Sequence, residues 1–447
     1  MYHIFSFNTI FRFWNFGQWV DVVIDDKLPV NEYNQLIYCH NRKENNEFFG
    51  PLLEKAYAKL NGCYEFLNAG FPTESLTDLT GAVCETFDIV KCVKETEQKR
   101  LMGGAYYNPQ FQSTDLSSLW KFIVNSHRMK SLMNASFYSS TEGGGSIEKR
   151  FPNGLVANHA YSVTQAVSFR LDKRERLLKL RNPWGSEPWK GEWSIDSTEW
   201  TGLSRSVKKR NKMSLEDGGE FYISFKDFAR FFERLDVAHV NLNAFSEAGD
   251  PSESESDWKM KDFYEKWRQG VNSGPRKPFF WANAQYFFEI SQDDESEDED
   301  ESEDESEDES EEDSEEESDE DDDEDDEDED EDEASLVIAL TQPYSAKLRY
   351  NNNGNYSFRS IKFDLFKVVS ESAEQQVRNG HKFNEGQLKL VESTGDFVMQ
   401  REITKRVFLA PGKYVVIPSV MEEVANADYL IRVYHDESEV SSIRKLV

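Results

Sequence analysis

The chain opens with stretches in which apolar and polar residues alternate, the pattern of a half-buried β-strand. Within residues 11–30, Val20, Val22 and Ile24 alternate with acidic residues, which predicts a strand that turns at Asp25. Residues 47–67 instead repeat their apolar positions at helical spacing, which predicts an amphipathic helix. The apolar stripe of this helix consists of Leu52, Leu53, Ala56, Tyr57 and Leu60.

Residues 160–240 combine the two patterns. The segments AYSVTQAVSF, RLLKLR and GEFYISF predict strands, and KDFARFFERL after them predicts a short helix. Ser224 lies just before this helix and is the expected N-cap, because a serine hydroxyl accepts a hydrogen bond from the first turn. We interpret the many aromatic residues of this region as core packing.

After residue 334 the chain returns to short alternating runs separated by turn residues. These runs are SLVIALTQ, YSFRSIKFDLFKV, ITKRVFLAPGKYVVIPS and ADYLIRVYHDE. Such a series is typical of an antiparallel β-sandwich.

The charge of the chain is concentrated in one run. The formal net charge is −34, but residues 293–333 contain only aspartate, glutamate and serine, and the remainder sums to +1. Repulsion between like charges predicts that this run is disordered. It also disfavours nucleic acid as a partner. The run is either a solvated insert without function or a ligand for basic surfaces, and one candidate surface contains Lys208, Lys209, Arg210 and Lys212.

The four cysteines show neither paired spacing nor a metal-ligand pattern, which favours reduced thiols in a cytosolic or nuclear protein. We expect a cytoplasmic location. No signal peptide is expected, because the aromatic start of the chain lacks a clean apolar segment and a cleavage site. No run of about 18 apolar residues occurs, so no membrane-spanning segment is expected.

The candidate chemistry lies in residues 153–185. His159 opens one predicted strand, and Asn182 closes the next, 23 residues later. In a papain-type site an imidazole takes a proton from a cysteine thiol, and an amide oxygen accepts the ring N–H and fixes the tautomer. We expect Trp184 to cover that hydrogen bond from water. Taken alone, a histidine on a strand is more often a packing residue, and Asn-Pro is more often a turn.

The sequence around these residues resembles that of the calpain family of cysteine proteases. Gly-Leu-Val-x-x-His-Ala-Tyr-Ser-Val followed by Leu-Arg-Asn-Pro-Trp-Gly is similar to the second half of the calpain protease core. Phe-Arg-Phe-Trp and Leu-Leu-Glu-Lys-Ala-Tyr-Ala-Lys-Leu-Asn-Gly match upstream, in the same order. The resemblance covers roughly residues 11–440 apart from the acidic run. It implies that His159 and Asn182 are catalytic and that the family activity is calcium-dependent limited proteolysis of protein substrates.

The resemblance also implies the fold and its domains. The expected fold is α+β: a papain-like calpain protease core with a truncated first lobe, followed by an all-β antiparallel sandwich. We expect a first-lobe remnant at 1–70, the second lobe at 71–240, a linker at 241–275 and the sandwich at 276–440, interrupted by the insert 293–333. No Asp-x-Asp-x-Asp-Gly loop occurs, so we do not expect an EF-hand domain.

The truncated lobe carries a prediction about stability. We expect the helix over 48–60 to lose the partner that buries its apolar stripe, so that residues 1–70 are loosely held.

The family's nucleophile is a cysteine in a Gly-Asp-Cys-Trp motif, where a helix N-terminus and the histidine lower the thiol pKa. Neither this motif nor the upstream glutamine of the oxyanion hole occurs in the sequence. Cys39, 120 residues before His159, is the best placed of the four cysteines, but it lacks the surrounding motif. A base without a thiolate cannot form an acyl-enzyme, so we expect the chain as written not to cleave peptides.

The family core binds one calcium ion in each lobe, and the resemblance assigns candidate ligands. Glu47 matches a glutamate of the first site, and Asp217 and Glu220 match the second. Carboxylate oxygens suit Ca2+. The chain departs from the family pattern by placing two glycines, Gly218 and Gly219, between the acidic pair. The alternative interpretation is a solvated acidic loop.

Three functional hypotheses remain open. The first is a calpain-type endopeptidase whose full chain includes the cysteine segment. The second is a catalytically dead, calpain-like regulatory protein that binds protein partners, calcium or, through the sandwich, phospholipid. The third is an acidic interaction protein that acts through residues 293–333. An upstream Gly-Asp-Cys-Trp distinguishes the first two, and deletion of the acidic run tests the third.

Overall fold

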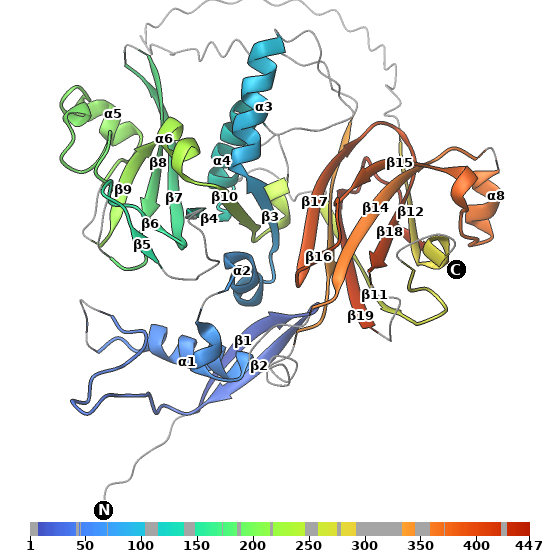
Figure 1. Ribbon diagram of the computed structural model, residues 1–447, viewed down its shortest axis with the longest axis horizontal. Coiled ribbons are helices and arrows are strands. Elements are labelled where there is room, and N and C mark those ends of the chain that lie inside the picture. The colour runs from blue at the N-terminus through green and yellow to red at the C-terminus, as the bar shows by residue number, and fades with distance from the viewer. Residues whose placement is uncertain are drawn as a thin grey trace, which may run out of the picture.

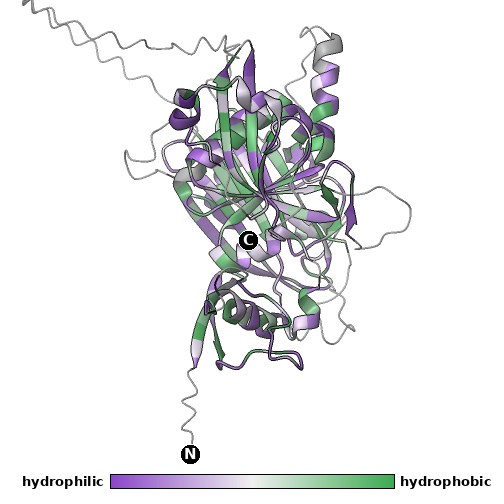
Figure 2. Ribbon diagram, turned by 90° about the vertical axis from the view of Figure 1, so that its left-hand side faces the viewer, coloured by the Kyte–Doolittle hydropathy of each residue, from purple (hydrophilic) through white to green (hydrophobic). Residues whose placement is uncertain are grey.

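The computed structural model places three groups of elements side by side: an N-terminal hairpin with a helix, a helix-covered sheet and a β-sandwich (Figure 1). Hydrophobic residues gather along the central strands, and the outer loops are largely hydrophilic (Figure 2). The structure describes residues 8–447 except 42–43, 45, 69, 103–114, 138–147, 172, 186–188, 215–217, 246–257, 275–278, 292–332, 345–357, 371 and 422–426. Within this described part, no helix has the length and apolar character needed to cross a membrane.

The N-terminal group consists of a β-hairpin and helix α1. Strands β1 (Thr9–Asn15) and β2 (Gln18–Ile24) pair antiparallel. The two-residue turn between them has positive φ at Phe16 and Gly17, the geometry of a tight hairpin. Helix α1 (Phe49–Asn61) is followed by η1 (Tyr64–Leu67).

The hairpin covers the apolar stripe of α1. Phe13, Val22, Ile24 and Ala56 form a buried cluster, against which Leu52 and the other stripe residues pack. The expectation that this helix lacks a partner is therefore wrong, because the strand predicted from the alternation at 20–24 supplies it. That residues 1–70 as a whole have low local stability stays a prediction. Strong protection of the α1 backbone amides from hydrogen exchange would contradict it.

The second group is a six-stranded antiparallel sheet in the order β3-β10-β4-β7-β8-β9. Its strands are β3 (Val83–Asp88), β4 (Leu132–Phe137), β7 (His159–Arg170), β8 (Arg174–Arg181), β9 (Glu220–Ser224) and β10 (Arg234–His239). Helix α2 (Pro72–Thr80) leads into β3, and the short hairpin of β5 (Lys149–Arg150) and β6 (Val156–Ala157) precedes β7. The strands predicted between residues 160 and 225 are confirmed.

Three helices bury one face of this sheet. They are α3 (Ile89–Met102), α4 (Leu116–Arg128) and α6 (Phe225–Phe231). Their apolar residues, including Ile123 and Phe228, form one core with sheet residues such as Tyr161 and Leu178. The side chain of Ser224 accepts a hydrogen bond from Asp227 N, which confirms the predicted cap. The connection from β8 to β9 contains η2 (Thr198–Thr201) and α5 (Arg205–Arg210).

The third group is the predicted sandwich. One sheet has the order β11-β19-β13-β17 and the other β15-β14-β18-β12-β20, with β16 beside β14. The strands are β11 (Trp258–Trp267), β12 (Gln285–Ile290), β13 (Ala334–Thr341), β14 (Ser360–Val368), β15 (Leu388–Ser393), β16 (Val398–Met399), β17 (Glu402–Leu409), β18 (Gly412–Val420), β19 (Ala427–Asp436) and β20 (Arg444–Leu446). The connections before and between these strands contain helix α8 (Ala373–Arg378) and the short 3-10 helices η3 (Leu242–Phe245), η4 (Phe279–Ala282) and η5 (Glu385–Gln387).

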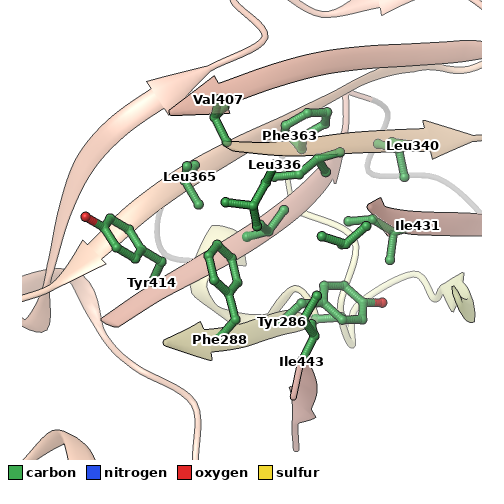
Figure 3. Packing of buried hydrophobic residues seen from close by; sticks show 14 of the residues in the cluster. Tyr286, Phe288, Leu336, Leu340, Phe363, Leu365, Val407, Tyr414, Ile431 and Ile443 are labelled. Atoms are coloured by element: carbon green, nitrogen blue, oxygen red, sulfur yellow. The ribbon is translucent and has the colours of Figure 1, made fainter. Parts of the chain in front are cut away.

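Side chains from both sheets interlock in the sandwich core, with Phe288, Leu336, Phe363 and Ile431 among them (Figure 3). Strand β11 corrects the predicted linker at 241–275, because it pairs along its whole length with β19. The acidic run lies almost entirely outside the described residues, between the end of β12 in one sheet and the start of β13 in the other.

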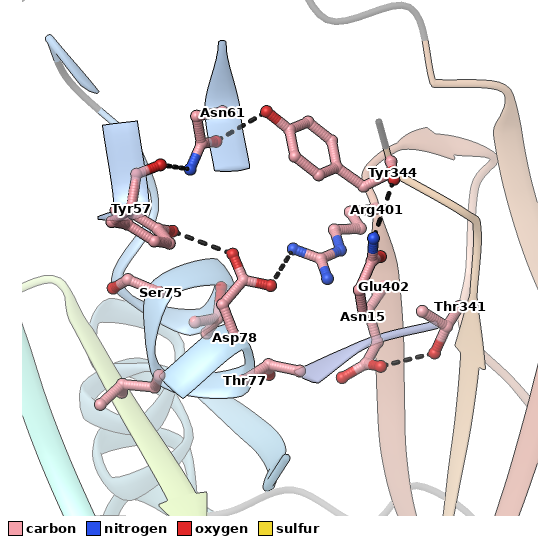
Figure 4. A network of polar contacts seen from close by, with 12 residues as sticks. Asn15, Tyr57, Asn61, Ser75, Thr77, Asp78, Thr341, Tyr344, Arg401 and Glu402 are labelled. Atoms are coloured by element: carbon pink, nitrogen blue, oxygen red, sulfur yellow. Dashed lines mark hydrogen bonds and ion pairs between the residues drawn. The ribbon is translucent and has the colours of Figure 1, made fainter. Parts of the chain in front are cut away.

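Buried ion pairs join the sandwich to the other two groups. Arg401, at the start of β17, places a guanidinium nitrogen 2.6 Å from a carboxylate oxygen of Asp78 in α2 (Figure 4). The Tyr57 hydroxyl of α1 donates to the other oxygen of that carboxylate at 2.9 Å. Farther along β17, Arg406 bonds to Glu85 of β3 at 2.8 Å. These contacts tie α1, α2 and β3 to one strand of the sandwich.

Candidate active site

The fold brings His159 and Asn182 together. His159 is the first residue of β7, and Asn182 follows β8, which runs antiparallel beside it with Arg181 opposite Ser162. The distance from His159 Nε2 to Asn182 Oδ1 is 2.9 Å. Asn182 is fully buried and His159 is 9 % exposed, so water has little access to this bond.

The orientation of the Asn182 amide follows from its other contact. Trp184 N lies 3.0 Å from Asn182 Oδ1, and a backbone N–H can only donate. The atom between Trp184 N and His159 Nε2 is therefore the amide oxygen, and the imidazole donates to it from Nε2.

The turn that carries Asn182 rests on a glycine pair before β9. Asn182 N donates to Gly219 O at 2.9 Å, and Gly185 N donates to Asn182 O at 2.9 Å. Gly219 has φ +83°, and a Cβ added there would lie 2.8 Å from Asn182 O. Only glycine fits this position without moving the turn. The second glycine, which departs from the family pattern, thus supports the asparagine.

Aromatic rings enclose the imidazole on two sides. The Trp184 ring centroid lies 4.8 Å from that of His159 at an interplanar angle of 50°, and Tyr161 approaches edge-on at 5.1 Å. The Arg150 guanidinium lies over the outer part of this stack, 5.4 Å from the Trp184 ring. Trp184 therefore lies against the imidazole, as the sequence predicts.

The second ring nitrogen of His159 has a partner that the sequence did not reveal. Nδ1 lies 2.8 Å from Oε1 of Glu148, the residue immediately before β5. The Glu148 side chain is 38 % exposed, whereas that of His159 is 7 % exposed. No motif or periodicity marks Glu148, and only the position of the β5–β6 hairpin brings it to the imidazole.

The described cysteines make no hydrogen bond to His159 or Asn182. Both ring nitrogens of His159 bond to oxygen. Burial raises the pKa of the Cys84 thiol to about 12 and that of Cys92 to about 11. At the exposed Cys39, desolvation together with Glu54 and Glu47 also raises the thiol pKa. A nucleophilic cysteine needs a lowered pKa, so these three thiols do not fit that role.

The candidate calcium ligands do not assemble a site in the described part of the chain. Glu220 Oε2 lies 2.7 Å from the ammonium of Lys179, and both side chains are largely buried. Glu47 Oε1 accepts a hydrogen bond from Phe49 N at the start of α1. Asp217 lies outside the described residues. The described residues contain no group of three or more His, Cys, Asp or Glu side chains placed to hold a metal ion. The ammonium beside Glu220 does not fit a cation there.

Comparison with known proteins identifies relatives. A family model described as calpain family cysteine protease matches residues 4–239, and one described as calpain large subunit, domain III matches residues 263–434. The calpain-1 catalytic subunit of Gallus gallus is 31% identical over 437 residues, covering 96% of this chain and 52% of that protein. The calpain-2 catalytic subunit of Gallus gallus is 29% identical over 440 residues, which cover 97% of this chain and 53% of that protein. The chain spans about half the length of the curated relatives it matches.

Proposed function

Because the chain belongs to the calpain family of cysteine proteases, we propose that it supplies the histidine–asparagine half of a calpain-type endopeptidase site. In this proposal His159 is the general base and Asn182 is the residue that orients its ring. The observation that carries the proposal is the 2.9 Å bond from His159 Nε2 to the buried Asn182 Oδ1. This bond commits Nε2 to the asparagine, so Nδ1, which faces Glu148 in this chain, is the ring atom assigned to proton transfer.

The chemistry assigned to each residue follows from that geometry. A cysteine thiol gives its proton to Nδ1, and the sulfur then attacks the carbonyl carbon of a peptide bond. Nδ1–H afterwards gives the proton to the amine that leaves, and Asn182 holds the imidazolium in place throughout. Trp184 shields the Nε2 bond, because its ring packs on the imidazole.

We propose that the nucleophile comes from a segment beyond these 447 residues, since no thiol of the described residues bonds to His159. Sequencing the full-length transcript from its 5′ end is the first measurement. An in-frame segment with Gly-Asp-Cys-Trp supports the endopeptidase, and a translation start at Met1 supports the inert alternative.

The direct test joins a first-lobe segment with the Gly-Asp-Cys-Trp motif to the N-terminus of this chain. We expect the fusion to hydrolyse casein and the 447-residue chain to be inactive in the same assay. His159→Ala in the fusion should lower kcat by at least about a thousandfold, because loss of the base disables the whole unit. Hydrolysis that survives His159→Ala would contradict the proposed role.

A second candidate is a catalytically inert, calpain-like binding protein. The contact between His159 and Glu148 and the raised pKa of the Cys84 and Cys92 thiols favour it for the 447-residue chain. On this candidate the sandwich binds protein partners or phospholipid, which sedimentation with anionic vesicles tests. Peptide hydrolysis by the 447-residue chain that depends on His159 would rule it out.

A further inference from the structure

Each ring nitrogen of His159 faces an oxygen that accepts hydrogen bonds. Asn182 Oδ1 lies 2.9 Å from Nε2, and the Trp184 N–H identifies it as the amide oxygen. Glu148 Oε1 lies 2.8 Å from Nδ1. An ionised carboxylate only accepts, so two acceptors face a ring that has a single N–H when it is neutral.

The two hydrogen bonds form together only when two protons are available, one for the contact with Asn182 and one for the contact with Glu148. One proton lies on Nε2, where Asn182 accepts it. The other lies between Nδ1 and the carboxylate oxygen. A doubly protonated ring donates to both acceptors at once.

We propose that Glu148 is the counter-ion of a His159 imidazolium and occupies the place at Nδ1 that a cysteine thiolate needs. The part about the thiolate rests on the proposed function, since it takes His159 as the base. The part about the counter-ion rests only on the two bonds. Glu148 is accordingly a positioning residue and a competing occupant. When its carboxylate leaves, the ring releases the Nδ1 proton to solvent, and the free Nδ1 then takes the proton of the incoming thiol.

The β5–β6 hairpin holds Glu148 in this place. Phe151 N donates to Leu155 O at 2.8 Å and closes the hairpin, and the Phe151 ring packs 5.2 Å from Phe137 at the end of β4. Arg150, two residues after Glu148, lies over Trp184. The hairpin therefore contacts both sides of the site and places the backbone of Glu148 beside the imidazole.

Nitrogen NMR of protein labelled with 15N-histidine tests the counter-ion directly. At pH 7 we expect two protonated ring nitrogens on His159 in the 447-residue chain and one in Glu148→Gln, with His159→Gln identifying the signals. The matched control is Glu175→Gln, which removes a carboxylate from the far end of β8, where it pairs with Lys173. This control should leave the His159 signals unchanged.

A chemical measurement gives an independent reading. Diethyl pyrocarbonate reacts with an unprotonated imidazole nitrogen. Glu148→Gln should therefore speed the modification of His159 on the order of tenfold, because the loss of one charge-assisted hydrogen bond corresponds to a change of about that size in the fraction of unprotonated ring. Glu148→Asp should restore part of the protection. Two protonated nitrogens in Glu148→Gln, or a single one in the unaltered chain, would overturn the proposal. Neither readout uses peptide hydrolysis, so a failed activity test leaves this result standing.

Discussion

Arg406 and Glu85 form a two-pronged ion pair across the boundary between the sandwich and the helix-covered sheet. Arg406 donates to one carboxylate oxygen at 2.8 Å and to the other at 3.1 Å. His239 Nε2 lies 2.8 Å from the same carboxylate, and Ser131 Oγ lies 3.1 Å from the other ring nitrogen of His239. Every one of these side chains is largely buried, so a network of buried polar contacts around Glu85 joins the two groups.

This pair predicts a loss of stability in acid. Burial by itself raises the pKa of Glu85, but Arg406 and His239 outweigh it and lower the pKa to about 2. A lowered pKa in the folded state contributes stability above the ordinary glutamate pKa of about 4.3, and this contribution is lost as the pH falls towards 2. Thermal unfolding measured between about pH 5 and pH 2 should show the loss.

The control for this prediction is Glu85→Gln, in which the acid-dependent contribution should be absent. The variant should also be destabilised at pH 7 by about 3–5 kcal/mol, because the largely buried Arg406 loses its counter-charge. An unchanged pH profile in Glu85→Gln would show that other groups cause the acid sensitivity.

The pair of Asp78 and Arg401 predicts a non-additive double variant. Asp78→Leu alone leaves a buried guanidinium unpaired and should lower the free energy of unfolding by about 3–5 kcal/mol. Asp78→Leu with Arg401→Met should cost less than either single change, because no buried charge remains. Urea unfolding of the four proteins measures the coupling, and simple additivity would argue against a direct interaction.

The pair of Lys179 and Glu220 predicts how the chain responds to calcium. Because an ammonium already neutralises Glu220, any rise in Tm caused by millimolar Ca2+ should be equal in the unaltered chain and in Glu220→Gln. Lys179→Gln should lower Tm, because it removes the ammonium that neutralises a largely buried carboxylate. A calcium-induced shift that disappears in Glu220→Gln would assign this residue to a metal site after all.

Gly219 predicts a substitution that acts on the site through the backbone. Gly219→Ala places a Cβ against Asn182 O at positive φ, and it should cost about 1–3 kcal/mol and disturb the His159 signals in NMR. The control is Gly386→Ala, where an added Cβ meets nothing within 4 Å. If His159 is undisturbed in Gly219→Ala, the glycine pair does not position the asparagine.

The sequence was sufficient where the signal is local or where strands pair in chain order. Alternation over residues 160–181 predicts β7 and β8, and neighbouring antiparallel strands necessarily bring His159 near Asn182. Ser224 is predictable as a cap because it bonds within its own first turn.

Contacts between distant parts of the chain were not predictable in this way. Glu85 and Arg406 are 321 residues apart, and nothing in the surroundings of either residue marks it as a partner. The sequence places β11 in a linker, although this strand pairs with β19 near the C-terminus. Glu148 and Lys179 were missed for a similar reason, because each acquires its role from the shape of the folded lobe.

The position of the acidic run has a consequence for how this protein can vary. The run begins just after β12 in one sheet and ends at β13 in the other, so the sandwich core fixes both of its ends. The like charges of the run predict a disordered segment, and the entropic cost of closing such a segment between fixed ends grows only logarithmically, by about 0.6 kcal/mol for each doubling of length. We therefore expect natural variants and engineered insertions to change this segment over a wide range of lengths with the rest of the fold intact.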